Sequence, residues 1–178
     1  MFFTVIFVFL FIILIIFVSR KLSPVPYFPT NKKDIPLIIK ALQLDKNKTV
    51  VDIGAGDGIV IFEAAKHAFK KGYGTKFYAI EINPILIFIM NIRRLFHKNK
   101  KNIYVSKEDF TKMSLKRFKN TVFYLYLSPK YLSLVYKKIK SEAKESKIIS
   151  YFYKIPKEKF RESHKNINSL FIYIRQSS

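Results

Sequence analysis

The chain has 178 residues, a formal net charge of +21 and no Cys. This length accommodates one domain with an appendage, and the missing Cys excludes disulfides, thiolate zinc sites and Cys nucleophiles. A hydrophobic content of 49% excludes intrinsic disorder despite the charge. The excess of Lys and Arg favours nucleic acid, anionic lipid or an acidic protein as partner, with compositional bias as the alternative.

The first 18 residues are almost entirely apolar, with Thr4 as the one polar side chain, and Arg20 and Lys21 follow. A helix of that length extends about 27 Å, close to the hydrocarbon thickness of a bilayer. No basic n-region or small-residue cleavage site indicates a cleaved signal peptide. We therefore expect a single-pass transmembrane anchor at residues 1–19. Because basic flanks stay inside, the rest of the chain is expected on the cytoplasmic side.

The segment 20–33 is a basic linker in which Pro24, Pro26 and Pro29 favour extended backbone. Asp34 can cap a short helix that runs to about Leu44. Apolar β-branched runs then alternate with helical patterns. We expect strands at 49–53, 77–82, 103–106, 121–127 and 147–153, helices at 59–69, 84–97 and 129–144, and a strand at 170–174 paired with 161–167. This alternation predicts an α/β domain over residues 34–178 with a doubly wound, mostly parallel sheet.

A glycine-rich loop follows the first strand, with the sequence Asp52-Ile53-Gly54-Ala55-Gly56-Asp57-Gly58. Alternating glycines allow a sharp turn and close approach to a ligand at the carboxyl edge of the sheet. The loop lacks the Gly-Lys-Ser/Thr ending of a P-loop, and Ile59 stands where a dinucleotide fingerprint needs glycine.

Two carboxylates narrow the ligand class. Asp52 and Asp57 would repel a pyrophosphate, so the loop favours a ligand with an ammonium group and no phosphate, although Asp57 can equally cap the following helix. Glu81 ends the second strand, where an acidic side chain can accept hydrogen bonds from both hydroxyls of a ribose. Together they predict an adenosine-type ligand with a zwitterionic tail, and S-adenosylmethionine fits.

These residues carry a family resemblance. The glycine loop resembles the first motif of class I S-adenosylmethionine-dependent methyltransferases, Glu81 their second, and Tyr126-Leu127-Ser128-Pro129 falls where their fourth motif lies. The resemblance implies a Rossmann-like methyltransferase domain whose cofactor contacts come from the loop, Glu81, Leu127 and, at the adenine, Asp109. Within the loop it assigns Asp52, Gly54, Ala55, Gly56, Asp57 and Gly58. Candidate catalytic positions are Tyr126, Ser128 and Pro129.

A narrower resemblance covers nearly the whole chain. The motifs Pro26-Tyr27-Phe28-Pro29-Thr30, Glu81-Ile82-Asn83-Pro84 and Tyr153-Lys154-Ile155-Pro156 are similar to those of membrane-anchored protein-lysine methyltransferases. That group includes the mitochondrial enzymes for the ATP synthase c-subunit and the adenine nucleotide translocase. The resemblance implies cofactor contacts from Tyr27, Thr30 and Asn83, and a protein-lysine substrate at or in the membrane. The Trp that typically follows Glu-x-Asn-Pro is replaced by Ile85.

Two other functions stay open. The segment 101–178 holds 18 of the basic and 6 of the acidic side chains, which suits an RNA methyltransferase, and a cofactor-binding protein without catalysis is the third alternative. No Asn-Pro-Pro-Tyr motif stands at the fourth strand, which argues against methylation of an amide or an adenine amino group. His67, His97 and His164 lack metal-ligand spacing, so no metal site is expected. A monomer is expected.

Overall fold

A seven-stranded sheet organises the part of the chain that the computed structural model describes, which comprises residues 2–18, 27–118, 120–143 and 145–174. Its strands are β1 (Thr49–Ile53), β2 (Lys76–Glu81), β3 (Ile103–Lys107), β4 (Thr121–Leu125), β5 (Ser146–Tyr151), β6 (Glu162–Lys165) and β7 (Ser169–Ile174). Their order is β3-β2-β1-β4-β5-β7-β6, with β1 to β5 parallel and β7 antiparallel to both neighbours. The predicted doubly wound, mostly parallel sheet is confirmed.

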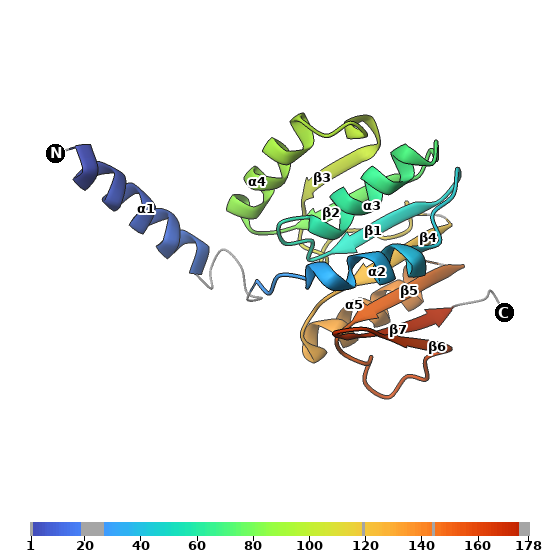
Figure 1. The fold of residues 1–178 in the computed structure, drawn as a ribbon. Helices are drawn as coiled ribbons and strands as arrows, with labels where there is room; N and C mark the ends of the chain where they lie inside the picture. Colours follow the sequence, from blue (N-terminus) through green and yellow to red (C-terminus); the bar gives the residue numbers. More distant parts are fainter. Residues whose placement is uncertain (1, 19–26, 119, 144, 175–178) are drawn as a thin grey trace.

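Helices cover both faces of this sheet (Figure 1). α2 (Ile35–Leu42), α3 (Ile59–Lys70) and α4 (Pro84–Leu95) contribute to the core on one face, and α5 (Pro129–Glu142) contributes to the core on the other. Two short 3₁₀ turns, η1 (Lys32–Asp34) and η2 (Lys100–Asn102), precede α2 and β3. Because side chains alternate along a strand, Val50 of β1 enters the first core and Val51 enters the second.

The strand-to-helix connections place polar groups at one edge of the sheet. Gly58 is the N-cap of α3, and the Asn83 side chain caps α4 by accepting hydrogen bonds from the backbone N–H groups of Ile85 and Leu86. α4 and α5 each begin with a proline, which suits the first turn of a helix. Since β1, β2 and β4 are parallel, their carboxyl ends meet at this edge.

Asp34 behaves differently from the prediction. It occupies the N-cap position of α2, but its side chain makes no capping hydrogen bond. The buried carboxylate instead accepts hydrogen bonds from the Tyr151 hydroxyl (2.7 Å), the Asn168 side-chain amide (3.0 Å) and the backbone N–H groups of Ile167 (3.0 Å) and Asn168 (3.1 Å). These partners lie far away in sequence, so local pattern does not reveal them. They fasten residues 27–34, which we call the strap, to the β5 and β6–β7 side of the domain.

α1 (Phe2–Val18) is apolar along its length and extends away from the sheet (Figure 1). It has 17 residues and therefore extends about 26 Å. Within the described part of the chain, no helix has both the length and the hydrophobicity required to cross a membrane. The transmembrane anchor expected at residues 1–19 is not supported by the structure, and its basic flank, Arg20 and Lys21, lies outside the described residues.

Candidate functional site

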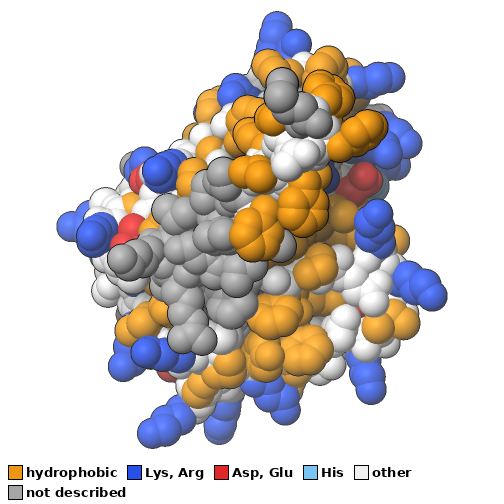
Figure 2. Space-filling model, turned by 90° about the vertical axis from the view of Figure 1, so that its left-hand side faces the viewer, with side chains coloured by type: hydrophobic (Ala, Val, Ile, Leu, Met, Phe, Trp, Pro, Cys, Tyr) orange, Lys and Arg blue, Asp and Glu red, His pale blue; other side chains and the backbone are white. Residues whose placement is uncertain are grey.

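A pocket opens where the strap crosses the carboxyl ends of β1, β2 and β4. Figure 2 views the molecule from this side. Most residues expected at a cofactor site line the pocket, namely Tyr27, Thr30, Asp52, Gly54, Ala55, Gly56, Asp57, Glu81, Asp109, Tyr126 and Leu127. Glu108 also lines the pocket, and further lining residues to which the sequence assigned no role include Phe28, Leu86, Phe110, Tyr124 and Tyr131.

The glycine loop lies so close to neighbouring side chains that its glycines leave no room for a Cβ atom. Gly54, Gly56 and Gly58 have φ values of 78°, 59° and 75°, in the left-handed region that favours glycine. A Cβ atom on Gly54 would lie 2.8 Å from Leu127 Cδ2, and one on Gly56 would lie 2.7 Å from Tyr27 Cε2. The loop is therefore a backbone cradle that only glycine can form between β4 and the strap.

Glu81 connects the end of β2 to this cradle. Its buried carboxylate accepts hydrogen bonds from the backbone N–H groups of Gly56 (2.8 Å), Ile82 (2.8 Å) and Asn83 (2.9 Å). A carboxylate offers about four acceptor positions, so Glu81 can still accept from a ligand hydroxyl. This arrangement both fixes the loop and presents a fixed negative charge to the pocket.

A cluster of carboxylates marks the centre of the pocket. Asp52 is buried, and its pKa is raised well above the ordinary value by burial and by the neighbouring Glu81 and Asp57 carboxylates. Asp57 pairs with Arg93 of α4 at 3.3 Å and also accepts a hydrogen bond from the backbone N–H of Ile59. It therefore caps the start of α3 while lining the pocket. A cationic ligand would relieve the repulsion at Asp52, whereas a phosphate would increase it.

The strap forms one wall of the pocket. Burial and the adjacent Asp57 carboxylate, which accepts the hydrogen bond of the Tyr27 hydroxyl, raise the pKa of Tyr27 to about 12. Phe28 and Thr30 also line the pocket. A bound ligand would thus lie between the strap and the glycine loop.

Tyr124 adds a polar group to the pocket, although its place in a buried strand predicts a core residue. It is the register partner of Asp52 across β1 and β4. Its hydroxyl is buried next to the Thr30 side chain of the strap, and burial and the Asp52 carboxylate raise its pKa well above the ordinary value. The sequence holds one indication of this placement, because Tyr126 lies two positions further along the chain and side chains two positions apart in a strand lie on the same face. A hydroxyl has one donor and two acceptor positions, so Tyr124 can also form a hydrogen bond with a polar group of a ligand in the pocket.

An aromatic cluster adjoins the pocket at Tyr126, which lines it, whereas Tyr151, Phe152 and Tyr153 lie outside the lining. The ring of Tyr126 lies 4.8 Å from that of Tyr151 and 6.3 Å from that of Phe152, and Phe152 lies 4.7 Å from Tyr153. Burial and Tyr153 raise the pKa of Tyr126. Phe152 has a φ of 73°, which is rare for a bulky residue. Its N–H donates to the Ser169 carbonyl at 2.8 Å, and the Ser150 hydroxyl donates to the Tyr153 carbonyl at 2.6 Å. These bonds stabilise a turn that ends β5 earlier than expected.

Another part of the pocket lies beyond β3. The Asp109 carboxylate accepts hydrogen bonds from the backbone N–H (2.9 Å) and hydroxyl (2.7 Å) of Thr111, which lower the pKa of Asp109. Glu108 pairs with Arg117 at 2.6 Å. Gly58, Asn83, Ser128 and Pro129 are not among the lining residues. They form the starts of α3, α4 and α5.

The lining residues fit S-adenosylmethionine. The glycine cradle accommodates a close-fitting chain, the carboxylates match its ammonium and sulfonium charges, and Glu81 matches a ribose. Tyr124 adds a buried hydroxyl to the lining. No group of three or more His, Cys, Asp or Glu side chains in the described segments could hold a metal ion.

Comparisons with known proteins agree with this geometry. The chain is 31% identical over 132 residues to the lysine N-methyltransferase of the ATP synthase c-subunit from Xenopus laevis, covering 71% of this chain and 52% of that protein. The protein of the same name from Homo sapiens is 30% identical over 135 residues, with 72% and 52% covered. The chain thus matches about half the length of these curated relatives.

Solved structures share the fold. An RNA methyltransferase from Salinibacter ruber, in complex with S-adenosyl-L-homocysteine, superposes with a TM-score of 0.75 at 16% identity, covering 85% of this chain and 95% of that one. A methyltransferase from Geobacter sulfurreducens, with the same ligand, has a TM-score of 0.56 at 14% identity and coverages of 82% and 58%. At these identities the likeness concerns the fold alone.

A family model shows to which sequence family the chain belongs. This family model, described as the ANTKMT methyltransferase domain, matches residues 52–162, which contain the glycine loop, Glu81 and the aromatic cluster. The cofactor of this methyltransferase domain is S-adenosylmethionine, as the resemblance implied. The chain belongs to the family of ANTKMT methyltransferase domains.

Proposed function

We propose that this chain is a protein-lysine N-methyltransferase that acts on a protein at a membrane surface. The relatives named as lysine N-methyltransferases support the substrate class. The structural observation that carries the proposal is the aromatic cluster of Tyr126, Phe152 and Tyr153 beside the cofactor pocket.

Methyl transfer to lysine sets two requirements for the protein. S-adenosylmethionine supplies an electrophilic methyl group on a sulfonium. The lysine nitrogen forms a bond to this methyl carbon as the carbon–sulfur bond breaks, giving methyl-lysine, S-adenosylhomocysteine and a proton released from the amine. The protein must hold both reactants in line, and it must keep the amine neutral when it attacks.

The aromatic cluster meets both requirements. Aromatic faces can pack against the apolar methylene groups of a lysine side chain and so align it with the cofactor. Apolar walls also disfavour the charged amine and so lower the pKa of an entering lysine. The raised pKa of Tyr126 keeps its phenol neutral, so its hydroxyl can form a hydrogen bond without adding a charge. Phe152 and Tyr153 are partly exposed and extend the aromatic wall outward from the pocket.

The membrane location rests on α1. The large apolar side chains described on this helix, from Phe2 to Phe11, are all exposed, with exposed fractions of 39% to 83%. A helix that is apolar all round requires an apolar environment, and we assign that environment to a bilayer. The basic residues that follow α1 in the sequence favour a position of the domain on the cytoplasmic side.

Labelling with the methyl group tests this function. The full chain in detergent is added to membranes and to purified RNA together with S-adenosylmethionine that carries a labelled methyl group. We expect label in protein, resistant to nuclease and recovered as methyl-lysine after hydrolysis. Label in RNA, or tight cofactor binding without any labelled product, would contradict the proposal.

Two variants serve as controls. Asp52→Asn removes the buried carboxylate from the pocket and should abolish transfer. Asp45→Asn changes a carboxylate that is 51% exposed and pairs with Lys48 on the surface, so it should retain activity. Full activity of Asp52→Asn would show that the cofactor site is wrongly placed.

A further inference from the structure

α4 carries apolar side chains on two sides. Leu86 and Met90 point into the core, as in any surface helix. Phe88, Ile89, Ile92, Leu95 and, just past the helix end, Phe96 are also apolar, yet they are exposed, with exposed fractions between 37% and 86%. We call these five residues the outer face of α4.

The outer face is a continuous stripe. At about 100° per residue its members fall within an arc of about 120°, on the side of the helix opposite the buried residues. A surface helix normally carries polar side chains there. α5 follows that rule with exposed Lys130, Lys137 and Lys140.

The surroundings of the outer face are basic. Lys98, Lys100 and Lys101 follow α4, and Lys100 and Lys101 are exposed, while Arg93 lies on its flank with 40% of its side chain exposed. Figure 2 shows the same arrangement on a larger scale, because hydrophobic side chains gather on the side that holds the pocket, and Lys and Arg project around its rim. An apolar strip with a cationic border matches an anionic lipid surface.

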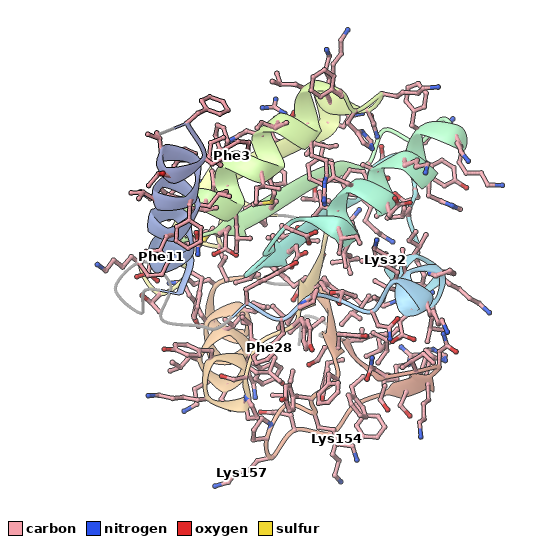
Figure 3. The ribbon with its side chains drawn as sticks, turned by 60° about the vertical axis from the view of Figure 1, so that its left-hand side comes forward. Phe3, Phe11, Phe28, Lys32, Lys154 and Lys157 are labelled. Carbon is pink, nitrogen blue, oxygen red and sulfur yellow. The ribbon has the colours of Figure 1, made fainter. Side chains whose placement is uncertain are left out.

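Other exposed apolar groups lie on the pocket side of the domain. α1 leaves the domain on the pocket side (Figure 1). Phe28 of the strap is 65% exposed, and in Figure 3 it lies between α1 and the loop that carries Lys154 and Lys157. The N-terminal turn of α4 contributes Leu86 to the pocket. Phe28 and the N-terminal turn of α4 therefore place apolar groups at the pocket itself.

We propose that the outer face of α4 docks on an anionic lipid bilayer, with the helix lying in the headgroup region beside the pocket entrance. This inference rests on the proposed attachment of α1 to a membrane and adds a second, separate contact. Docking would hold the pocket at a fixed height above the lipid, so that lysines close to the membrane boundary become the accessible acceptors.

The composition of the chain allows a direct test. It contains no Trp, so Phe88→Trp introduces a unique fluorophore in the outer face. Phe69→Trp is the matched control, because Phe69 is 49% exposed near the end of α3, the helix that runs from the pocket toward the opposite edge of the sheet. Leu95→Trp, at a position that is 65% exposed, repeats the test further along α4. Retained binding of S-adenosylmethionine verifies that each variant is folded.

Each full-length variant is reconstituted with vesicles of phosphatidylcholine and phosphatidylglycerol whose acyl chains are brominated near the headgroup. We expect Phe88→Trp and Leu95→Trp to shift their emission to the blue and to lose about half of it, since interfacial helices insert about 5–10 Å. Phe69→Trp should show neither effect. Equal quenching at Phe69→Trp and Phe88→Trp would overturn docking by α4.

Two further readouts separate this proposal from the others. Flotation of the chain with vesicles reports attachment by α1. Flotation without quenching at Phe88→Trp would overturn docking by α4 and leave attachment by α1 intact. Absence of flotation would overturn both membrane contacts. Phe88→Cys provides a unique Cys, since the chain has none. Efficient disulfide linkage between two copies in dilute vesicles would assign the outer face to a second copy and overturn lipid docking. None of these readouts depends on methyl transfer.

Discussion

Asp34 provides the sharpest test of how the strap is held. In Asp34→Ala, the Tyr151 hydroxyl and the Asn168 side chain keep their mutual hydrogen bond of 2.6 Å. The backbone N–H groups of Ile167 and Asn168 lose their acceptor. Both hydrogen bonds are partly buried, so water can replace the lost acceptor in part. A hydrogen bond to a charged group contributes about 1.5–3 kcal/mol, and Asp34→Ala should therefore lower the free energy of unfolding by about 2–3 kcal/mol.

Equilibrium unfolding of the full chain in mild detergent, followed by circular dichroism, measures this loss. Asp45→Ala is the matched control, because Asp45 also accepts a backbone hydrogen bond and pairs with Lys48, but at the surface. Its removal should cost at most about 1 kcal/mol. Equal destabilisation by Asp34→Ala and Asp45→Ala would refute the reasoning.

The pH dependence gives an independent check on Asp34. Burial raises its pKa, but the hydrogen bonds from Tyr151 and Asn168 outweigh burial and hold the pKa below the ordinary value of 3.8. A group with a lowered folded-state pKa stabilises the protein above its unfolded pKa, and this contribution is lost as the pH falls through the folded value. The stability difference between the native chain and Asp34→Asn should be constant near neutral pH and shrink below about pH 4. A difference that grows in acid would contradict the assignment.

Three further predictions concern the pocket. Gly56→Ala places a Cβ 2.7 Å from Tyr27 and should weaken S-adenosylmethionine binding at least tenfold by calorimetry. Gly72→Ala is the control, because Gly72 has a similar φ of 67° but open space around it, and this variant should lower stability and leave the cofactor affinity unchanged. Equal losses of affinity in Gly56→Ala and Gly72→Ala would argue against the cradle. Cofactor affinity should fall with decreasing pH as Asp52, whose pKa is raised, becomes protonated, and Asp52→Asn should flatten this profile; a wild-type profile without such a fall would exclude the charge contact. Phe152→Gly relieves a φ of 73° and should leave stability equal or higher by up to about 1 kcal/mol, yet methyl transfer should fall while cofactor affinity stays unchanged; undiminished transfer would remove Phe152 from the acceptor wall.

Local sequence was sufficient to predict where the glycine loop and Glu81 lie. The glycine loop lies between an apolar strand and a helix, and Glu81 ends the next strand, so both follow from strand-to-helix alternation. Parallel strands bring their carboxyl ends to one edge whatever the details of packing. The sheet and the hairpin at the end of the chain could be predicted for the same reason, because apolar periodicity depends only on neighbouring residues.

The positions of Tyr124 and of the aromatic cluster depend on contacts between distant segments. Tyr124 resembles any core residue of a buried strand, and only its pairing with β1 places its hydroxyl beside Asp52. Phe152 follows β5 as if it continued the strand, and its left-handed turn is stabilised by a hydrogen bond to Ser169 of β7. Alternation with Tyr126 indicates the face of the strand on which Tyr124 lies but not its neighbour Asp52, and the turn at Phe152 leaves no periodic signal in the sequence.

The sequence by itself determined the sheet, the glycine cradle and the acidic residues that surround the cofactor, because each is set by residues adjacent in the chain. Only the tertiary structure decided how the strap is fastened, where the aromatic wall stands and that α4 presents a second apolar face. Asp34, Phe152 and Phe88 acquire their roles from burial and exposure, and these are properties of the folded surface that no local pattern contains.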